Sequence, residues 1–525
     1  MNEASADVRT SGEPSTNKHS PVTELSRWEP AVAGAAIILG LALRFWPRGP
    51  LWLDEALSVN IARVPFGELQ AYLKQDGHPP LYYALLHVWT GTMGTSTFAV
   101  RALSIIISLA GFPLTWLVAR RAGGTRAALW AVAVWAILPY GVRYSTETRM
   151  YVLVMVLVLA GWWFLGRLWS EPRWPDAAAL AVIASVLLWT HYWAMWLLAA
   201  VGAATVLRRW LNRALPNANR ELLLTGGALG LAGLSFLPWV PTLLFQAERT
   251  GTPWGAVERP TTAVVITLID FAGQPSAEPQ LMTYVLVFLI VVALVGRTRG
   301  DDRWGLVLAA PARRQAMWAL ALALGTLLIG ATAAMASGAT FVSRYAAVIY
   351  PLVVVLIGWG LAACPPRLRG VLGAVVLAGS LAGIALSINV PRSISGTAAQ
   401  VIEAKAPDAL VVTCPDQLSV ALGRELPDGQ QLVSYPELDS DPRFIDWVDY
   451  AQRVKAADPA EVADKVWTLA DGRPVVLGYS DTYDTHREAC PAFLAALSEG
   501  HRTEILLSST GQDAFENMSL VRLDP

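Results

Sequence analysis

The chain of 525 residues contains 54% hydrophobic and 15% charged residues, and its mean hydropathy is +0.42. This composition is too apolar for a soluble protein with an ordinary surface and indicates a membrane protein. The formal net charge of −1 and the pI near 6.6 give no support for nucleic-acid binding.

The chain begins with a polar segment, and a series of apolar runs follows. Residues 1–27 are rich in Ser, Thr, Glu and Pro and have no apolar core, which excludes a secretory signal and predicts a disordered cytoplasmic tail. Most of the apolar runs are roughly 17–25 residues long, enough for a helix to cross about 30 Å of hydrocarbon. We expect about eleven spanning helices in a transmembrane domain over residues 28–390. They lie near residues 29–46, 99–119, 127–143, 150–167, 177–190, 193–207, 221–245, 280–296, 315–336, 345–362 and 370–388.

Arginine residues indicate how these helices are oriented, because cytoplasmic loops keep the positive charge. Alternate loops carry most of the arginines: Arg120, Arg121 and Arg126; Arg167 and Arg173; Arg208, Arg209, Arg213 and Arg220; Arg297, Arg299, Arg303, Arg313 and Arg314; and Arg367 and Arg369. The amino terminus is therefore predicted to be cytoplasmic and the carboxyl region to lie outside the plasma membrane. This requires residues 79–94 to lie along the membrane surface within a long external loop, about residues 47–98.

From about Ser395 the pattern changes to short β-rich runs that alternate with amphipathic helices. It predicts a small extracytoplasmic α/β domain over residues 395–525, in which we find no phosphate loop or nucleophile elbow. Cys414 and Cys490 share this oxidising compartment and are a candidate disulfide, whereas Cys364 lies at the cytoplasmic end of a span. The sequence does not show whether their Cα atoms come within about 7 Å.

Ionisable residues gather near the predicted external ends of the spans. They include Asp54, Glu55, Asp76, His78, Arg101, Glu147, Arg149, His191 and Arg344, with Tyr345 beside the last. Such groups are costly near a membrane and mark functional sites. A transporter more often places them at mid-membrane, so this clustering indicates a site where an amphiphilic substrate lies with its head group in water.

Each of these residues also has a purely structural explanation. Asp54 and Glu55 favour a helix amino terminus, but a sugar-transferring enzyme also needs a carboxylate to accept a proton from the incoming hydroxyl. The sequence His78-Pro79-Pro80 forms a rigid turn, and the same histidine can bond a phosphate or sugar oxygen. Arg149 and Arg344 are suited to snorkelling at an interface and equally to bidentate phosphate capture.

Several motifs, taken in order, resemble those of the GT-C membrane glycosyltransferases. They are Leu53-Asp54-Glu55, Asp76-Gly77-His78-Pro79-Pro80-Leu81, Arg101, and Tyr144-Ser145-Thr146-Glu147-Thr148-Arg149-Met150-Tyr151. Within that group the chain is similar to the family 39-like branch, which contains protein O-mannosyltransferases and the lipid A aminoarabinose transferase. The resemblance covers roughly residues 29–365.

The resemblance implies an inverting transfer of a sugar from a polyprenyl-phosphate carrier to an extracytoplasmic acceptor. Asp54 matches the catalytic acidic position of the family, His78 its HPP element and Arg101 a basic position. Mannose is the favoured sugar, ahead of arabinose and other sugars. The chain lacks the inserted β-trefoil domain of the O-mannosyltransferases, which puts a protein acceptor in doubt and favours a cell-envelope glycan or lipid.

The predicted site then combines two catalytic carboxylates, Asp54 and Glu55, with residues that bind the substrate or its phosphate. The binding residues are His78, Arg101, Glu147, Arg149, His191, Arg344 and Tyr345. No cofactor is required by this chemistry, although Asp54 or Glu55 would be the ligand of a divalent cation, Mg²⁺ or Mn²⁺, if one takes part. Two alternatives are a flippase or transporter of a lipid-linked sugar, and a non-catalytic membrane scaffold.

Overall fold

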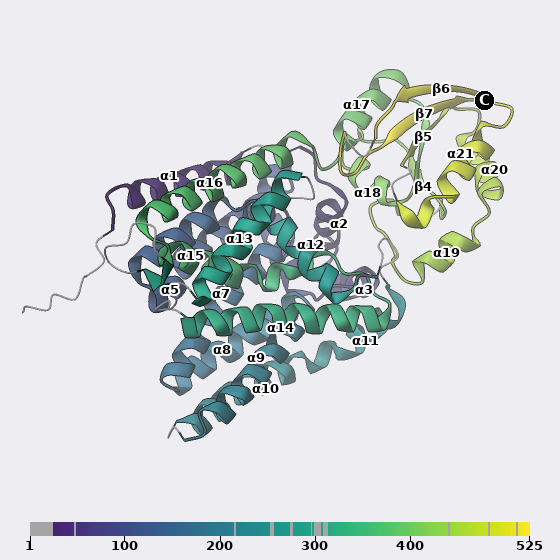
Figure 1. Ribbon diagram of the computed structural model, residues 1–525. Coiled ribbons are helices and arrows are strands. Elements are labelled where there is room, and N and C mark those ends of the chain that lie inside the picture. The colour runs from purple at the N-terminus through teal and green to yellow at the C-terminus, as the bar shows by residue number, and fades with distance from the viewer. Residues whose placement is uncertain are drawn as a thin grey trace, which may run out of the picture.

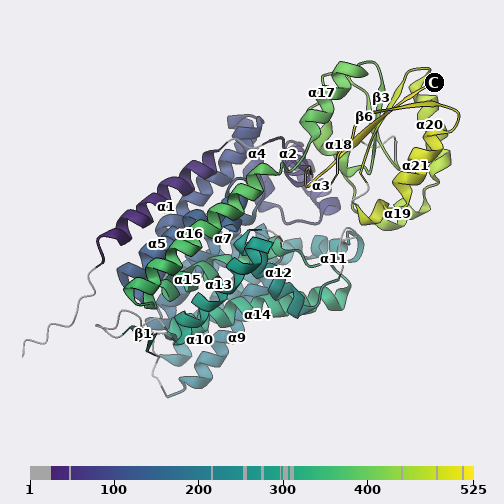
Figure 2. The ribbon, with the colours of Figure 1, turned by 45° about the horizontal axis from the view of Figure 1, so that its top comes forward.

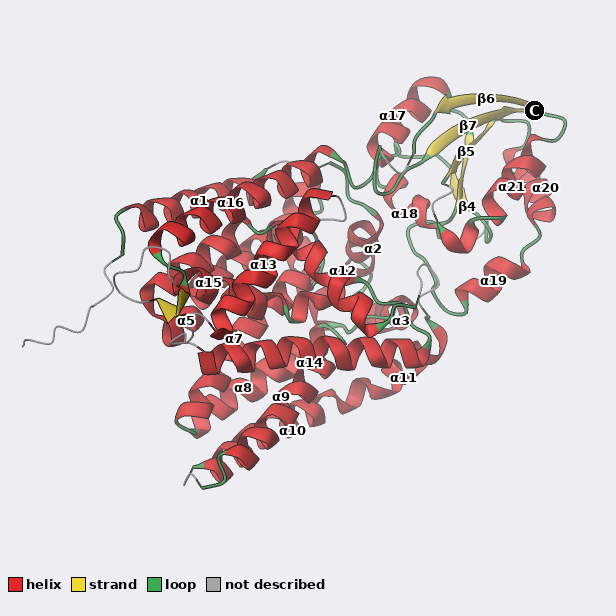
Figure 3. Ribbon diagram, viewed as in Figure 1, coloured by secondary structure: helices red, strands yellow, loops and turns green. Residues whose placement is uncertain are grey.

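The structure is a computed structural model that describes residues 25–46, 49–214, 217–251, 257–273, 277–295, 297–298, 306–307, 313–438, 441–480, 483–510 and 513–525. The predicted tail, residues 1–27, lies almost wholly outside these ranges. Figure 3 separates a helical body from a smaller region in which helices flank a sheet. The predicted polytopic helical fold with a small carboxyl-terminal α/β region is thereby confirmed.

The helical body is built from long apolar helices that pack side by side (Figure 1). They are α1 (Trp28–Phe45), α5 (Thr97–Ile137), α6 (Pro139–Ser145), α7 (Tyr151–Ser170), α8 (Trp174–Thr190), α9 (Ala194–Leu211), α10 (Ala218–Phe236), η2 (Leu237–Trp239), α11 (Val240–Arg249), α12 (Pro260–Ala272), α13 (Ala277–Val295), α14 (Arg313–Ser337), η3 (Ser343–Val348), α15 (Tyr350–Ala363) and α16 (Pro366–Asn389). Two short strands, β1 (Arg297–Thr298) and β2 (Leu306–Val307), pair antiparallel. Helix α15 is buried along almost its whole length and forms the centre of the body.

Seven helical segments in the described part of the chain are long and apolar enough to cross a membrane, and shorter apolar helices of 10–17 residues accompany them. The chain is therefore a multi-pass membrane protein. Each of the eleven predicted spans falls on helical segments of the structure. The predicted span 99–119 lies in the 41-residue α5, and the span 127–143 covers the end of α5 and most of α6. Helix α5 is broken at Gly124, where φ is 76° and a side chain would be strained. Helix α12 was not predicted, because its 13 residues are too few for a span.

Four short helices fill the first loop between α1 and α5. They are α2 (Leu53–Ala62), η1 (Phe66–Glu68), α3 (Leu69–Asp76) and α4 (Leu81–Met93). Helix α4 is the predicted interfacial helix, and Leu85, Val88 and Met93 on it are exposed. The loop lies at the end of the body that faces the α/β region (Figure 2).

The α/β region is a five-stranded sheet covered by helices. Its elements are α17 (Ser395–Lys405), β3 (Leu410–Cys414), α18 (Gln417–Leu422), β4 (Leu432–Ser434), α19 (Tyr450–Ala456), α20 (Pro459–Ala470), β5 (Val475–Tyr479), η4 (Asp484–His486), α21 (Ala489–Ser498), β6 (Arg502–Leu507) and β7 (Ser519–Asp524). The strand order is β4-β3-β5-β7-β6, and β7 runs antiparallel to both of its neighbours. Strand β3 is parallel to β4 and β5. Apolar residues of α20 and α21 form a core with one face of the sheet, and those of α17 and α18 form a core with the other.

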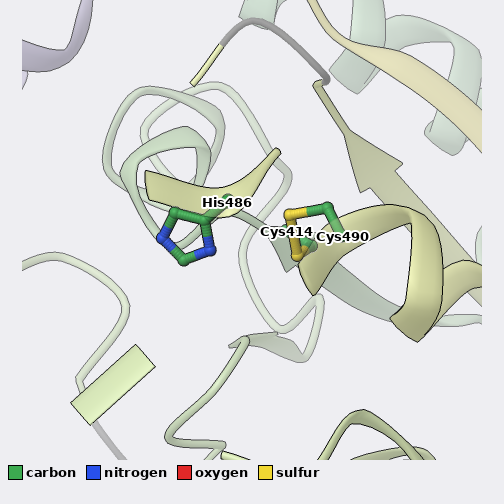
Figure 4. Close-up of side chains that lie close together, drawn as sticks. All are labelled: Cys414, His486 and Cys490. Carbon is green, nitrogen blue, oxygen red and sulfur yellow. A yellow bond between two sulfur atoms is a disulfide. The ribbon is translucent and has the colours of Figure 1, made fainter. Parts of the chain in front are cut away.

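A disulfide joins Cys414 at the end of β3 to Cys490 in α21, with 5.5 Å between their Cα atoms. Figure 4 shows this pair with His486 beside it. Cys364 is free and buried at the end of α15. The bridge ties the sheet to one of its covering helices.

The α/β region packs directly on the first loop. The Leu53 backbone amide donates to Glu516 Oε1 (3.2 Å), and the Asn60 side-chain amide donates to the Arg443 carbonyl (2.8 Å). The Trp447 backbone amide donates to the Gln75 carbonyl (3.3 Å). These contacts hold two segments together that lie more than 350 residues apart in the chain. The site described next lies at this junction.

Candidate active site

A cavity of about 300 Å³ lies between the first loop and the α/β region. The helical body contributes Trp52, Leu53, Asp54, Leu57, Asp76, His78, Arg149, Tyr151, Arg344 and Tyr345, and the α/β region contributes Gln417, Trp447, Tyr483 and Phe515. Figures 1 and 2 both place α2 and α3 next to this region. Charged groups thus line one part of the cavity and aromatic rings another.

Asp54 lies in the first turn of α2, after the extended residue Trp52. A carboxylate is favoured there by the helix dipole. Its Oδ2 accepts a hydrogen bond from Arg344 Nη1 at 2.8 Å, and about a sixth of each side chain remains exposed, 15% for Asp54 and 17% for Arg344. Arg344 comes from η3, almost three hundred residues later, so the pair joins the first loop to the entrance of α15. One face of this carboxylate is open to the cavity.

A chain of hydrogen bonds connects Asp76, His78 and Arg149. Gly77 ends α3 with φ at 86°, a conformation that suits glycine, and it turns the chain so that His78 Nδ1 lies 2.9 Å from Asp76 Oδ2. His78 Nε2 lies 3.0 Å from Arg149 Nη2. Because arginine only donates, Nε2 must accept, and the imidazole proton is therefore on Nδ1, directed at Asp76.

Asp76 is held in its ionised form by these neighbours. Burial alone raises the pKa of Asp76, but His78, Arg149 and the Tyr83 hydroxyl, which donates to Oδ2 at 2.8 Å, together bring this pKa below its usual value. Asp76 therefore orients the imidazole, which in turn orients Arg149.

Arg149 has one donor that no described protein group uses. Its Nη1 donates to Ser58 Oγ at 2.9 Å and to the Asp54 carbonyl at 3.3 Å. Among the described residues its Nε is buried without a hydrogen-bond partner. Together with Arg344, it gives the cavity two guanidinium groups, the side chains best suited to phosphate.

Glu55 does not line this cavity, although it follows Asp54 directly. It forms a bidentate pair with Arg101, whose Nε and Nη2 lie 2.8 and 2.6 Å from the two carboxylate oxygens, and it accepts the Thr148 amide at 2.9 Å. Burial alone raises the pKa of Glu55, but Arg101 outweighs it and the pKa lies below its usual value. Arg101 also donates to the carbonyls of Gly49 and Pro50 and so fixes the chain that enters α2. These contacts fit a structural role for both residues, and the catalytic role of Glu55 and the phosphate-binding role of Arg101 stay predictions.

Glu147 belongs to the same separate group. It lines a smaller cavity of about 110 Å³ with Glu55, Arg101, Arg143 and Arg392. Its Oε2 lies 3.0 Å from Arg392 Nη1, and burial raises the pKa of Glu147 above its usual value even though Arg392 and Arg143 oppose this. Arg392 comes from the segment after α16 and was not among the predicted residues. The sequence predicted that Glu147 binds the substrate, whereas in the structure it lines the smaller cavity with Glu55 and does not line the larger one.

His191 is buried between the rings of Tyr151 and Tyr345, at centroid distances of 5.7 and 5.8 Å. Its Nδ1 accepts the Trp193 amide at 3.2 Å, and burial lowers the pKa of His191 to about 3, so the ring is neutral. The histidine supports two rings that line the cavity but does not line it. Tyr345 does line it, as does His78.

The predicted residues thus fall into two sets. Asp54, His78, Arg149, Arg344 and Tyr345 meet at the larger cavity, whereas Glu55, Arg101, Glu147 and His191 do not. The residues that the α/β region contributes were missed. They are aromatic or amide side chains that follow no motif, so no signal in the sequence distinguishes them from core residues.

The residues around Asp54 fit a divalent cation poorly, because its nearest charged partner is the cation Arg344. Within the described ranges, three His, Cys, Asp or Glu side chains with metal-ligand spacing occur together only at Cys414, His486 and Cys490 (Figure 4). The two cysteines are joined in the disulfide, so they offer no thiolate.

Comparison with known proteins bears on the fold of the chain. Residues 77–239 match the model of a family described as dolichyl-phosphate-mannose-protein mannosyltransferase. A search of curated protein sequences finds no match. Among solved structures, ArnT from Cupriavidus metallidurans in the apo state matches with a TM-score of 0.57 and 14% identity, covering 94% of this chain and 97% of that one. The same protein bound to undecaprenyl phosphate matches with a TM-score of 0.53, 15% identity and the same coverage.

A more distant match is the oligosaccharyltransferase of Archaeoglobus fulgidus tethered with an acceptor peptide, with a TM-score of 0.48, 10% identity and coverage of 91% of this chain and 72% of that one. The family model and the ArnT structures confirm the resemblance to GT-C glycosyltransferases that the motifs indicate. The chain has the GT-C fold.

Proposed function

We propose that this chain, a multi-pass membrane protein with the GT-C glycosyltransferase fold, transfers a sugar with inversion from a polyprenyl-phosphate carrier to an acceptor. The observation that carries the proposal is the meeting of one partly exposed carboxylate, Asp54, with two guanidinium groups, the buried Arg149 and the partly exposed Arg344, in one cavity. A carboxylate accepts a proton, and two guanidinium groups bind a phosphate. These are the two requirements of the reaction.

In the proposed mechanism Asp54 accepts the proton of the acceptor hydroxyl while the hydroxyl oxygen attacks C1 of the sugar. The bond from C1 to the phosphate oxygen breaks, and its electron pair stays on the phosphate. Arg149 and Arg344 stabilise the charge that develops there, and the Asp76–His78 pair holds Arg149 in position. Glu55 has no step, because both of its oxygens already accept hydrogen bonds from Arg101.

The lipid carrier and the sugar are supported by different observations. The fold neighbour ArnT has been solved bound to undecaprenyl phosphate, which supports a polyprenyl-phosphate donor. The name of the matching family model favours mannose. We keep a cell-envelope glycan or lipid as the favoured acceptor, and protein O-mannosylation as the second function.

The test is conversion of a radiolabelled polyprenyl-phosphate mannose by the purified protein in nanodiscs, with cell-envelope lipids and glycans as acceptors. We expect labelled product from the wild type and from Glu68→Gln, an exposed carboxylate of the same loop, but none from Asp54→Asn. A flippase would move the donor and leave it intact. Equal conversion by the wild type and by Asp54→Asn would overturn the proposal.

We also propose that the amino terminus is cytoplasmic and that the α/β region lies outside the plasma membrane. The arginine-rich loops support this orientation, and so does the disulfide, since such bonds persist in oxidising compartments. In differential alkylation of intact cells, Cys414 and Cys490 should resist labelling until reduced. Cys364, which is buried, should label without reduction once the protein is unfolded. Free labelling of all three would contradict this orientation.

A further inference from the structure

A second cavity, of about 400 Å³, lies at the other end of the helical body. Helix α7 begins with Tyr151 at the first cavity and ends with Trp169 and Ser170 at the second, after 20 residues or roughly 30 Å. The second cavity is also lined by the carboxyl-terminal end of α9 and the amino-terminal ends of α10 and α14. In Figure 1 the ends of α9 and α10 at the lower left lie far from the α/β region. The proposed transfer reaction uses none of these residues.

The lining of this cavity is strongly basic. Its described residues include four arginines, Arg121, Arg208, Arg209 and Arg314, but a single carboxylate, Glu221. That carboxylate is already paired, because Arg208 donates to both of its oxygens at 2.8 and 3.1 Å. The other three arginines have no carboxylate partner in the cavity. They are partly or fully exposed, so an anion that enters can reach them.

Tryptophan side chains surround these charges. Trp162, Trp163, Trp169, Trp318 and Trp359 line the cavity. The Arg208 guanidinium lies 4.5 Å from the Trp169 ring and 5.6 Å from the Trp318 ring, which fixes this end of α9. Among the described residues, Trp169 Nε1 is a buried donor without a hydrogen-bond partner. Tryptophan is typical of the depth at which lipid head groups lie.

A small apolar pocket of about 30 Å³ adjoins the cavity at Trp162 and is lined otherwise by aliphatic residues and a glycine of α7, α8, α9, α14 and α15. Basic groups at the end of an apolar membrane helix bundle suit a molecule with an anionic head and a hydrocarbon chain. A soluble phosphate would use only the first of these features.

We propose that this cavity binds the head group of an anionic phospholipid, with its phosphodiester on Arg121, Arg209 and Arg314 and its chains in the surrounding membrane. Basic pockets between membrane helices on the cytoplasmic side are suited to such head groups, and the cytoplasmic side is where the arginine distribution places this end of the body. Guanidinium groups bind phosphate through charge-assisted hydrogen bonds. Because α7 runs from this cavity to the first one, the bound lipid stabilises a helix that carries part of the site.

The test compares two triple variants that remove the same charge from the same loops. The lining variant is Arg121→Gln, Arg209→Gln and Arg314→Gln, and the matched control is Arg120→Gln, Arg213→Gln and Arg313→Gln, whose exposed side chains do not line the cavity. Binding of a fluorescent phosphatidylglycerol is titrated in nanodiscs of phosphatidylcholine. We expect saturable binding that the lining variant weakens about tenfold and the control less than about twofold. Equal loss in both variants, or equal binding of phosphatidylcholine, would overturn the proposal.

Competition then distinguishes the sources of the phosphate. Unlabelled phosphatidylglycerol should displace the probe, whereas inorganic phosphate should not. Displacement by undecaprenyl phosphate at lower concentration than by phosphatidylglycerol would assign the cavity to the lipid carrier and contradict a phospholipid. Circular dichroism verifies that each variant is folded. If the lining variant is not, Arg314→Gln alone, at an exposed position, is compared with Arg313→Gln, and equal affinities there would also overturn the proposal.

Discussion

Asp54 and Glu55 are adjacent in the sequence, but they lie on sides of helix α2 that differ in their cavities and hydrogen-bond partners. Successive side chains of a helix point about 100° apart, so these two carboxylates face different cavities. Asp54 has one arginine partner and borders a cavity of about 300 Å³ that reaches the α/β region. Glu55 is held by three hydrogen bonds beside a cavity of about 110 Å³. Both residues are carboxylates, so we expect the one whose oxygens have fewer hydrogen-bond partners, Asp54, to act as the base.

The largest expected effect is that of Asp54→Asn on turnover. The variant should lower kcat by roughly 10²–10⁴, because an amide cannot accept the proton of the acceptor hydroxyl. Donor affinity should stay within about tenfold, since the base acts in the transition state more than in the ground state. Transfer rates and donor titrations on the purified protein measure both quantities. Near-normal turnover of Asp54→Asn would show that Asp54 is not the base and would contradict the difference in role between Asp54 and Glu55.

Glu55→Gln should act on stability more than on chemistry. It leaves the buried Arg101 without a full counter-charge, and breaking one partner of a buried pair costs about 3–5 kcal/mol. We expect a lower Tm, and turnover within about tenfold of the wild type in the protein that remains folded. The double variant Glu55→Gln, Arg101→Gln should recover part of the loss. A reversal, with the larger effect on kcat at Glu55, would move the base by one residue.

Arg149→Ala and Arg344→Ala should weaken donor binding. Each removes charge-assisted bonds worth roughly 1.5–3 kcal/mol. Titration with a polyprenyl-phosphate donor checks this, with Arg249→Ala, a half-exposed arginine outside the cavity, as the control. Unchanged affinity in both variants would leave these arginines as anchors at the membrane interface.

A further expected effect, on stability and not on the reaction, concerns pH and the contact between Glu516 and the start of α2. Burial raises the pKa of Glu516 to about 8 from an ordinary value of 4.5. Between pH 4.5 and pH 8 this carboxyl is therefore protonated in the folded state and ionised in the unfolded state. Stability should therefore be full below about pH 4.5 and fall towards pH 8, by at most about 1.4 kcal/mol per pH unit. Tm measured at pH 5 and pH 8 should show this fall in the wild type and in Glu425→Gln, an exposed control, but less of it in Glu516→Gln. An unchanged pH dependence in Glu516→Gln would contradict it.

The membrane fold was largely predictable, because hydrocarbon imposes a length and an apolar composition on every spanning helix. The short β-rich runs that follow Ser395 include Val411–Thr413 and Val475–Leu477, which lie in β3 and β5. Strand β7 (Ser519–Asp524) was missed, although its alternation of apolar residues with Arg522 and Asp524 is typical of a strand with one buried face. Helix α12 was missed for its shortness.

The site was predictable where it lies on motifs of the first loop and of the segment before α7, and at Arg344 and Tyr345 before α15. The motifs predicted that Asp54, His78 and Arg149 belong to one site, and the three residues do line one cavity. It could not separate Asp54 from Glu55, because their environments depend on Arg344 and Arg101, which come from distant helices. Nor could it assign Trp447 or Tyr483 to the cavity, because that assignment requires knowing how the α/β region packs on α2.

Leu53 and Glu516 are in contact although 463 residues separate them in the chain, so the ribosome makes the two partners at different times. A ribosome that adds about 5–20 residues per second needs roughly 20–90 s to go from one partner to the other. Throughout that interval the first loop has emerged without the residues that complete its cavity. A nascent chain is therefore inactive until its last residues are made. A premature stop between the end of α16 and Phe515 should leave a chain that still inserts into the membrane but lacks part of the wall of its cavity.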